Sequence, residues 1–337
     1  MSASLSRLGE FGLIREIARL FNQGVPPEVQ GIGDDCAVIP LNSKQSLLVT
    51  TDLLIENRHF LLNRIPAHEL GWKSLAVSIS DIAAMGGIPS GAFLSISIPS
   101  TLSLKWIRDF YKGIKKCCDT YHVYLLGGDT TKSPGPLVIN FTVTGKAATD
   151  KIKYRSNARP GDLICVTGWL GDSGGGLRIL LENKPQRQLE KKLIKRHHVP
   201  LPQVEEGLFL AGFKDVSAMM DVSDGIDSDI RRIMEASGTG AVITTDNLPI
   251  SGELKTVCQR YGWDSTTIAL TGGEDYCLLL TLKPGSYEAI AGKFRKRFNK
   301  NLSVIGKIVP SRNGLSYKKE GKTIQLRARG FDHFMTS

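Results

Sequence analysis

Two adjacent aspartates directly behind a pair of glycines constrain this chain more than any other feature. The motif is Gly31-Ile-Gly-Asp-Asp35, and an apolar, strand-like run follows it at residues 36–40. Glycines let a backbone turn tightly and approach a ligand, while neighbouring carboxylates repel each other unless a cation or bound water screens them. A divalent metal is the simplest resolution. An Asx-rich turn between two strands explains the motif equally well when it is taken alone.

Acids and hydroxyls recur where predicted elements end. Thr50, Thr51 and Asp52 close a predicted strand over residues 46–52, and oxygen ligands of this kind are those that Mg²⁺ prefers. Ser78 and Asp81 are three residues apart in a predicted helix and therefore share a face. Because an acid among small apolar residues is costly unless paired, Asp81 is either metal-bound or hydrogen-bonded internally, and the sequence does not decide between these.

Three further glycine-rich segments carry acids or lead into a helix. Gly127-Gly-Asp-Thr-Thr131 follows a strand and offers a Gly-Gly hinge that admits a phosphate or nucleotide. Asp221 and Asp224 lie three residues apart at a predicted helix start, where Asp221 is equally well explained as a helix cap. The cluster at 168–176 resembles a phosphate cradle in outline, but it lacks the lysine of a P-loop.

Length and composition indicate a two-domain α/β protein. A chain of 337 residues exceeds the size at which single cores stop growing, and the pattern breaks near residue 150. The apolar runs are far shorter than a membrane span requires, and the N-terminus has no secretory pattern, so we expect a cytoplasmic protein without membrane association. The six cysteines are scattered, which is typical of reduced, packed thiols.

The formal net charge of +10 raises the question of nucleic-acid binding. The two most basic runs, at residues 191–198 and 293–300, interleave apolar side chains at helical spacing. Solvated faces of amphipathic helices explain these runs better, so we expect no nucleic-acid partner. A basic surface also helps to gather anionic substrates.

Taken together, the recurring acids point to phosphoryl transfer. Such a cluster is costly without cations, and in this chemistry Mg²⁺ neutralises a polyphosphate while the protein mainly positions it. Seven acids lie at glycine-rich or small-residue turns of a chain otherwise rich in Lys and Arg. They are Asp34, Asp35, Asp52, Asp81, Asp129, Asp221 and Asp224.

With these residues in view, the sequence closely resembles the thiamine-monophosphate kinase family, within the superfamily of aminoimidazole ribonucleotide synthetase and selenophosphate synthetase. The matching motifs occur in the family's order over nearly the whole chain. They are Gly31-Ile-Gly-Asp-Asp35, Thr51-Asp52 with His59-Phe60, Ser80-Asp-Ile-Ala-Ala-Met-Gly86, Gly127-Gly-Asp-Thr-Thr131, Arg155-Ser156 with Pro160-Gly-Asp162, Asp221-Val-Ser-Asp-Gly225, Gly272-Gly-Glu-Asp-Tyr276 and Gly330-Phe-Asp-His-Phe334.

The resemblance implies a homodimer that phosphorylates thiamine monophosphate with ATP to give thiamine diphosphate, the final step of its biosynthesis. Each subunit would have an N-terminal α/β domain at residues 1–150, whose sheet contributes to the dimer interface, and a C-terminal α/β domain at 151–337. By analogy, several Mg²⁺ ions are held by Asp34, Asp35, Thr50, Thr51, Asp52, Asp81, Asp129, Asp221 and Asp224. ATP is contacted by Gly128, Asp129, Arg155 and Ser223, and thiamine monophosphate by His59, Glu274 and Phe331. Catalysis falls to Asp35, Asp52, Asp81, Asp129, Arg155 and Asp224.

The expected mechanism needs no general base. A phosphate monoester has a second pKa of ~6 and is largely dianionic near neutral pH, so its oxygen can attack directly and in line. The chain departs from the family pattern at Asn57-Arg58, at Ser78 and at Gln203. The rival interpretations are a synthetase of the same superfamily, a basic nucleic-acid-binding protein and a thiamine-phosphate carrier that consumes no ATP.

Overall fold

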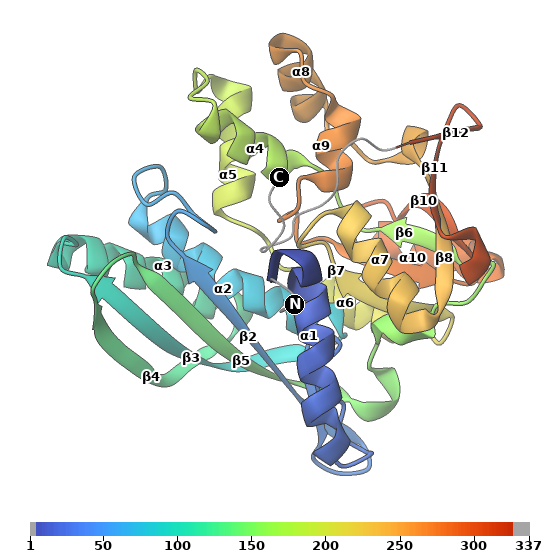
Figure 1. Cartoon of the computed structure of the whole chain (residues 1–337), viewed down its shortest axis with the longest axis horizontal. Coiled ribbons are helices and arrows are strands. Elements are labelled where there is room, and N and C mark those ends of the chain that lie inside the picture. The colour runs from blue at the N-terminus through green and yellow to red at the C-terminus, as the bar shows by residue number, and fades with distance from the viewer. Residues whose placement is uncertain (1–4, 326–337) are drawn as a thin grey trace.

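Two β-sheets organise the computed structural model, which describes residues 5–325 (Figure 1). The first sheet has the strand order β1-β2-β5-β3-β4, and the second has the order β12-β11-β8-β10-β6-β9-β7. The strands of the first sheet are β1 (Ala37–Pro40), β2 (Gln45–Ile55), β3 (Ile88–Pro99), β4 (Tyr124–Ser133) and β5 (Val138–Ala148). Those of the second are β6 (Leu163–Val166), β7 (Val216–Asp221), β8 (Thr239–Thr244), β9 (Leu278–Leu282), β10 (Ser303–Pro310), β11 (Leu315–Lys319) and β12 (Lys322–Ile324).

Some of the described α-helices pack on these sheets, whereas those within residues 172–198 and 252–271 lie mainly against one another (Figure 1). In chain order they are α1 (Leu5–Phe21), α2 (Ala67–Ala84), α3 (Leu104–Tyr121), α4 (Asp172–Leu181), α5 (Gln188–His198), α6 (Val204–Ala211), α7 (Ile226–Ser237), α8 (Gly252–Tyr261), α9 (Ser265–Thr271) and α10 (Tyr287–Phe298). None of these helices is both long enough and apolar enough to cross a bilayer.

Among residues 5–325, helices cover only one face of the first sheet. Helices α2 and α3 bury alternate side chains of its strands, such as Leu48 and Phe141, as expected for a sheet with one face on a core. The opposite face exposes Leu53 and Phe93, and the edge strand β4 exposes Leu126. In the part of the chain that the structure describes, the first sheet therefore presents an uncovered, partly apolar face.

The second sheet is covered on both faces. One core joins it to α4, α5, α7, α8 and α9, with Ile230 and Leu254 fully buried, and a smaller core joins its other face to α6 and α10 through Leu210 and Phe294. The basic runs of α5 and α10 are the outer faces of amphipathic helices, since Leu193 and Phe294 on the same helices are buried. The amphipathic interpretation of these runs is confirmed.

Helix α2 connects the two halves because its backbone contacts helices of both. A Cβ atom on Gly113 of α3 would lie 1.9 Å from the carbonyl oxygen of His68, so only glycine permits this crossing. On the other side, a Cβ on Gly207 of α6 would lie 2.1 Å from the carbonyl oxygen of Ala83. The position of α2 between the two halves therefore fixes the side chains that it carries.

Several predicted boundaries were wrong in ways that affect the site. Strand β2 continues to Ile55, so Thr51 and Asp52 lie inside a strand and alternate between its faces instead of converging at its end. Strand β4 runs through Gly127 and Gly128, which therefore form no hinge. Helix α4 begins at Asp172, and the glycines that follow are helical.

Candidate metal and phosphate site

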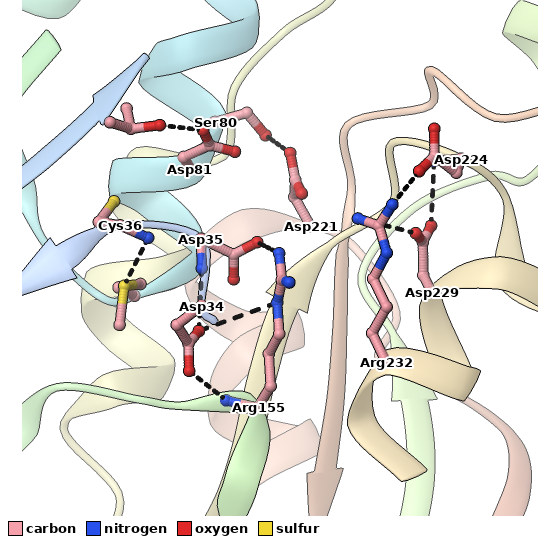
Figure 2. Close-up of polar contacts among 12 residues, drawn as sticks. Asp34, Asp35, Cys36, Ser80, Asp81, Arg155, Asp221, Asp224, Asp229 and Arg232 are labelled. Atoms are coloured by element: carbon pink, nitrogen blue, oxygen red, sulfur yellow. Dashed lines mark hydrogen bonds and ion pairs between the residues drawn. The ribbon is translucent and has the colours of Figure 1, made fainter. Parts of the chain in front are cut away.

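Three carboxylates from three separate segments meet beside α2 (Figure 2). Asp35 precedes β1, Asp81 lies on α2 and Asp221 ends β7. One ligand atom from each lies within 4.8 Å of the others, which is the spacing of atoms that share one cation. Residues more than 180 positions apart in the sequence thus form one acidic centre.

Hydroxyl groups hold these acids in place. Thr50 donates its Oγ1 proton to Asp81 at 2.5 Å, Ser80 donates to Asp221 at 2.6 Å, and Ser78 donates to Asp52 at 2.7 Å. The sequence left open whether Asp81 binds a metal or is hydrogen-bonded internally. The structure shows the internal hydrogen bond, and Asp81 also belongs to the trio of carboxylates that could hold a metal.

Asp221 is not a helix cap. It is the last residue of β7, and α7 begins only at Ile226 with Gly225 as its N-cap. Its carboxylate is buried and accepts the hydroxyl proton of Ser80. The alternative that the sequence left open at this position is therefore excluded.

Burial makes the negative charge of this centre costly. Burial first, and the neighbouring Asp35 second, raise the pKa of both Asp34 and Asp221 to about 7. The pKa of Asp81 is raised well above its usual value by burial and by Asp52. Cys36 is buried beside the acids, and burial followed by their charge raises the pKa of its thiol, so it packs as a neutral side chain. A bound cation would favour the ionised carboxylates and so lower their pKa values.

Arg155 supplies one internal countercharge (Figure 2). Its guanidinium forms an ion pair with Asp35, and its backbone amide donates to Asp34 at 3.1 Å. One buried oxygen of Asp35, Oδ2, nevertheless has no hydrogen-bond partner. A partnerless carboxylate oxygen beside two further carboxylates is the all-oxygen donor set that Mg²⁺ takes, so the residues present fit the metal.

A second arginine neutralises the turn after β7. Arg232 forms ion pairs with Asp224 and, at 3.9 Å, with Asp229. Asp229 is fully buried, and its Oδ2 accepts the backbone N–H of Asp224 at 3.3 Å. Sequence reasoning missed Asp229 and Arg232, although their three-residue spacing on α7, directly after an acidic turn, was a usable signal.

Two predicted ligand residues stand apart from the carboxylate trio. Strand register places Asp52 opposite Phe141, Phe141 opposite Leu94, and Leu94 opposite Gly128, so Gly128 and Asp129 are three strand spacings, roughly 14 Å, from Asp52. Thr51 points to the uncovered face of the sheet, where it accepts a hydrogen bond from Asn140 at 2.9 Å. Neither Asp129 nor Thr51 reaches the trio within this chain.

Two of the three predicted substrate residues lie on described loops, and one of these loops runs beside the acids. His59 accepts the backbone N–H of Ile55 at its Nδ1 atom, 3.0 Å away. The backbone N–H of Glu274 donates to the carbonyl oxygen of Ser223 at 2.7 Å, which places Glu274 next to the Asp221–Asp224 turn. Phe331 lies outside the described residues.

The glycine cluster at 168–176 has a structural role instead of forming a phosphate cradle. The backbone amides of Gly171 and Ser173, at the start of α4, donate to the two carboxylate oxygens of Asp275 at 2.6 and 3.2 Å. Asp275 thus occupies the helix terminus that an anion would take. A Cβ on Gly176 would lie 2.3 Å from the carbonyl oxygen of Leu193, so this glycine serves close helix packing.

Comparison with known proteins places the chain in a family. Residues 33–147 match the family model "AIR synthase related protein, N-terminal domain", and residues 159–318 match the corresponding C-terminal domain. A thiamine-monophosphate kinase of Aquifex aeolicus is 39% identical over 82% of this chain and 87% of its own, and that of Salmonella typhimurium is 37% identical over 97% and 99%. The chain belongs to the thiamine-monophosphate kinase family.

A solved structure of this family agrees with the fold over the whole chain. AaThiL in complex with AMPPCP and TMP has a TM-score of 0.84 and 34% identity, covering 99% of both chains. Two of the residues at which this chain departs from the pattern of the thiamine-monophosphate kinase family have clear local roles. Ser78 donates a hydrogen bond to Asp52, and the buried Gln203 accepts the hydroxyl proton of Thr167 at 2.5 Å. The predicted fold class, of two α/β domains of the AIR synthase type, is confirmed.

Proposed function

We propose that this chain transfers the γ-phosphoryl group of ATP to thiamine monophosphate and so forms thiamine diphosphate, as the last step of its biosynthesis in the cytoplasm. The observation that carries the proposal is the trio Asp35, Asp81 and Asp221, with Arg155 beside it, in a member of this family. The bound ligands of AaThiL, AMPPCP and TMP, support both substrates.

The acidic centre would bind the metal. Asp34, Asp35, Thr50, Asp52, Asp81, Asp221 and Asp224 are the residues we assign to it. Bound Mg²⁺ ions supply charge neutralisation of the polyphosphate. The hydroxyls of Ser78 and Ser80 hold two of the carboxylates with their oxygens fixed, so little reorganisation is needed when ligands bind.

The remaining residues bind and orient the two substrates. Arg155 and Ser223 would contact phosphate groups, and Arg155 is already held at the acidic centre by Asp34 and Asp35. His59, Glu274 and Phe331 would bind the thiamine portion. Because the acceptor phosphate is largely dianionic, these residues need only align its oxygen with the γ-phosphorus, and no general base is required.

We assign Gly128 and Asp129, on the exposed surface of the edge strand β4, to ATP. The N-terminal unit of residues 1–150 would supply this surface and most metal ligands. The unit of residues 151–337 would complete the site with Arg155, Asp221, Ser223 and Asp224. Asp129→Ala should then raise the Michaelis constant for ATP more than that for thiamine monophosphate.

We also propose that two copies associate through the uncovered face of the first sheet. Leu53, Phe93 and Leu126 are 50%, 41% and 61% exposed there, and apolar side chains gathered on one sheet face are typical of a protein interface. Light scattering after size exclusion should give twice the chain mass, and Phe93→Asp should give the monomer. A wild-type monomer at micromolar concentration would refute the dimer.

A direct assay tests the reaction. The purified chain with ATP, Mg²⁺ and thiamine monophosphate should yield thiamine diphosphate and ADP in equal amounts, and chelation of the metal should stop turnover. Binding of thiamine monophosphate without ATP consumption would indicate a carrier instead. ATP consumption that depends on a different acceptor would indicate a synthetase of the superfamily.

A further inference from the structure

A fully buried lysine reaches the proposed substrate residue from the other half of the chain. Lys73 lies on α2 and is 0% exposed, and its Nζ lies 3.0 Å from each carboxylate oxygen of Glu274. A buried ammonium group is costly unless it is paired, and removal of one partner strands the other charge. The Lys73 side chain therefore depends on the ionised state of Glu274, and the reverse also holds.

A buried histidine completes this group. His197 of α5 places its Nδ1 atom 3.0 Å from Oε2 of Glu274 and 3.0 Å from the hydroxyl of Ser173. Burial and Lys73 lower the pKa of His197 to about 4, so at neutral pH the imidazole ring is uncharged. Burial alone would raise the pKa of Glu274, but Lys73 and His197 hold it well below its usual range.

The Glu274 carboxylate keeps capacity for a ligand. Its side chain is 24% exposed, and a carboxylate offers about four acceptor positions, of which Lys73 and His197 use three. Its backbone adopts φ +54°, a left-handed conformation that is rare outside glycine and persists where surrounding contacts enforce it. These contacts hold the partly exposed carboxylate of Glu274 in place, on a loop that lies next to the turn containing Asp224.

We propose that Lys73, assisted by His197, is a positioning residue that keeps Glu274 ionised and fixed so that it can bind the cationic thiamine portion of the substrate. This inference rests on the proposed function. Thiamine carries a permanent positive charge on its thiazolium ring, and a fixed carboxylate complements that charge. Lys73 itself is buried and acts only through Glu274.

A second group of the same composition provides the control. Glu69, also on α2, is bonded to Lys195 of α5 at 2.6 Å and to His198 at 2.9 Å. It joins the same two helices through a carboxylate, a lysine and a histidine, but it has no contact with the Glu274 loop among the described interactions. A change at Glu69 therefore tests whether loosened packing between α2 and α5 is enough to affect substrate binding.

The experiment measures steady-state constants for thiamine monophosphate. Lys73→Met should raise the Michaelis constant about tenfold and change kcat by less than about threefold, because a charge-assisted contact used in binding is lost. The groups facing Glu274 are Lys73, His197 and Tyr276, and without Lys73 burial raises the carboxyl pKa. The increase should therefore grow as pH falls from 8 to 6. Glu69→Gln should leave the Michaelis constant unchanged.

A double-mutant cycle decides the mechanism. If Lys73 acts through Glu274, the double variant Lys73→Met with Glu274→Gln should have the Michaelis constant of Glu274→Gln alone. The double variant leaves no buried charge, and in Glu274→Gln the buried lysine can lose its proton and remain neutral, so this comparison stands even if Lys73→Met does not fold. Additive effects, a pH-independent increase, or an equal increase in Glu69→Gln would overturn the inference.

A failure of the proposed function would give a different result from a failure of this inference. If the proposed function is wrong, the wild type makes no thiamine diphosphate. If only this inference is wrong, the wild type is active and the double-mutant cycle gives additive effects. Calorimetric binding of thiamine monophosphate to each variant without ATP should repeat the pattern of the cycle. Unchanged binding by Glu274→Gln would remove Glu274 from the substrate site and the inference with it.

Discussion

The acidic centre and the Glu69 group each include a carboxylate of α2, Asp81 and Glu69, and the carboxylates of the two groups behave in opposite ways. At the centre, burial and like charges raise the pKa of Asp221 to about 7. At Glu69 burial acts in the same direction, but hydrogen bonds from His198 and Lys195 outweigh it and lower the pKa to about 2. The contrast shows that burial does not decide the charge of an acid. The partners of the acid do, and within residues 5–325 the centre has fewer of them than Glu69 has.

The largest expected effect comes from removing one acid of the centre. Asp35→Ala, or Asp52→Ala, should lower kcat by about 10³-fold or more, because the phosphoryl group would lose its charge neutralisation. Both variants should remain folded, since each removes one carboxylate from a crowded centre, and in Asp35→Ala the neighbouring Asp34 still pairs with Arg155. Asp119→Ala, which breaks only an exposed pair with Lys115, should keep full activity. Near-normal turnover of Asp35→Ala would show that the centre is not catalytic.

The effect of pH on thermal stability should be smaller than the loss of activity, and its sign at the acidic centre should be opposite to that at Glu69. The folded-state pKa of Asp34 and Asp221 is raised, so their ionisation destabilises the metal-free protein as pH rises from about 4 through 7. Without Mg²⁺, Tm should therefore fall by roughly 5 °C between pH 5.5 and 8 relative to the Mg²⁺-loaded protein. Differential scanning calorimetry at both pH values measures this. Equal curves with and without Mg²⁺ would contradict it.

Glu69→Gln should have the smallest effect. The pKa of Glu69 is lowered, so its contribution is present above the unfolded value of 4.5 and is lost as pH falls towards 2. The variant should lose only about 1 kcal/mol of unfolding free energy at pH 7, because the ion pair is partly solvated. The loss should be smaller at pH 3, where the Glu69 carboxylate is closer to its pKa. Urea unfolding measures both values. A loss that is the same at pH 7 and pH 3 would mean that the charge of Glu69 contributes nothing.

The sequence predicted the acids of the centre better than the residues that support them. Asp35, Asp81 and Asp221 stood out because glycine or small residues surround them. Lys73 and His197 carried no such signal, since a lysine in an apolar helix is usually read as reaching solvent. Only the packing of α2 against the second half shows that Lys73 is enclosed.

Other predictions failed because they depended on contacts distant in sequence. The glycine cluster before α4 suggested a phosphate site, and nothing nearby indicated that Asp275, about 100 residues later, caps it. Thr51 was grouped with Thr50 and Asp52 as a ligand, but strand alternation turns it to the other face of β2. The length of β2, which sets this alternation, depends on its pairing with β5.

The glycine contacts of α2 restrict how the halves of related chains can be exchanged. Since Gly113 and Gly207 bring two helices against its backbone, α2 cannot shift towards either half without a main-chain collision. A hybrid enzyme that joins residues 1–150 of this chain to the second half of a relative would have to retain a glycine at the position of Gly207. With a larger residue there, Asp81 and Lys73 would both move away from Asp221 and Glu274, and one misfit would disable metal and substrate binding together.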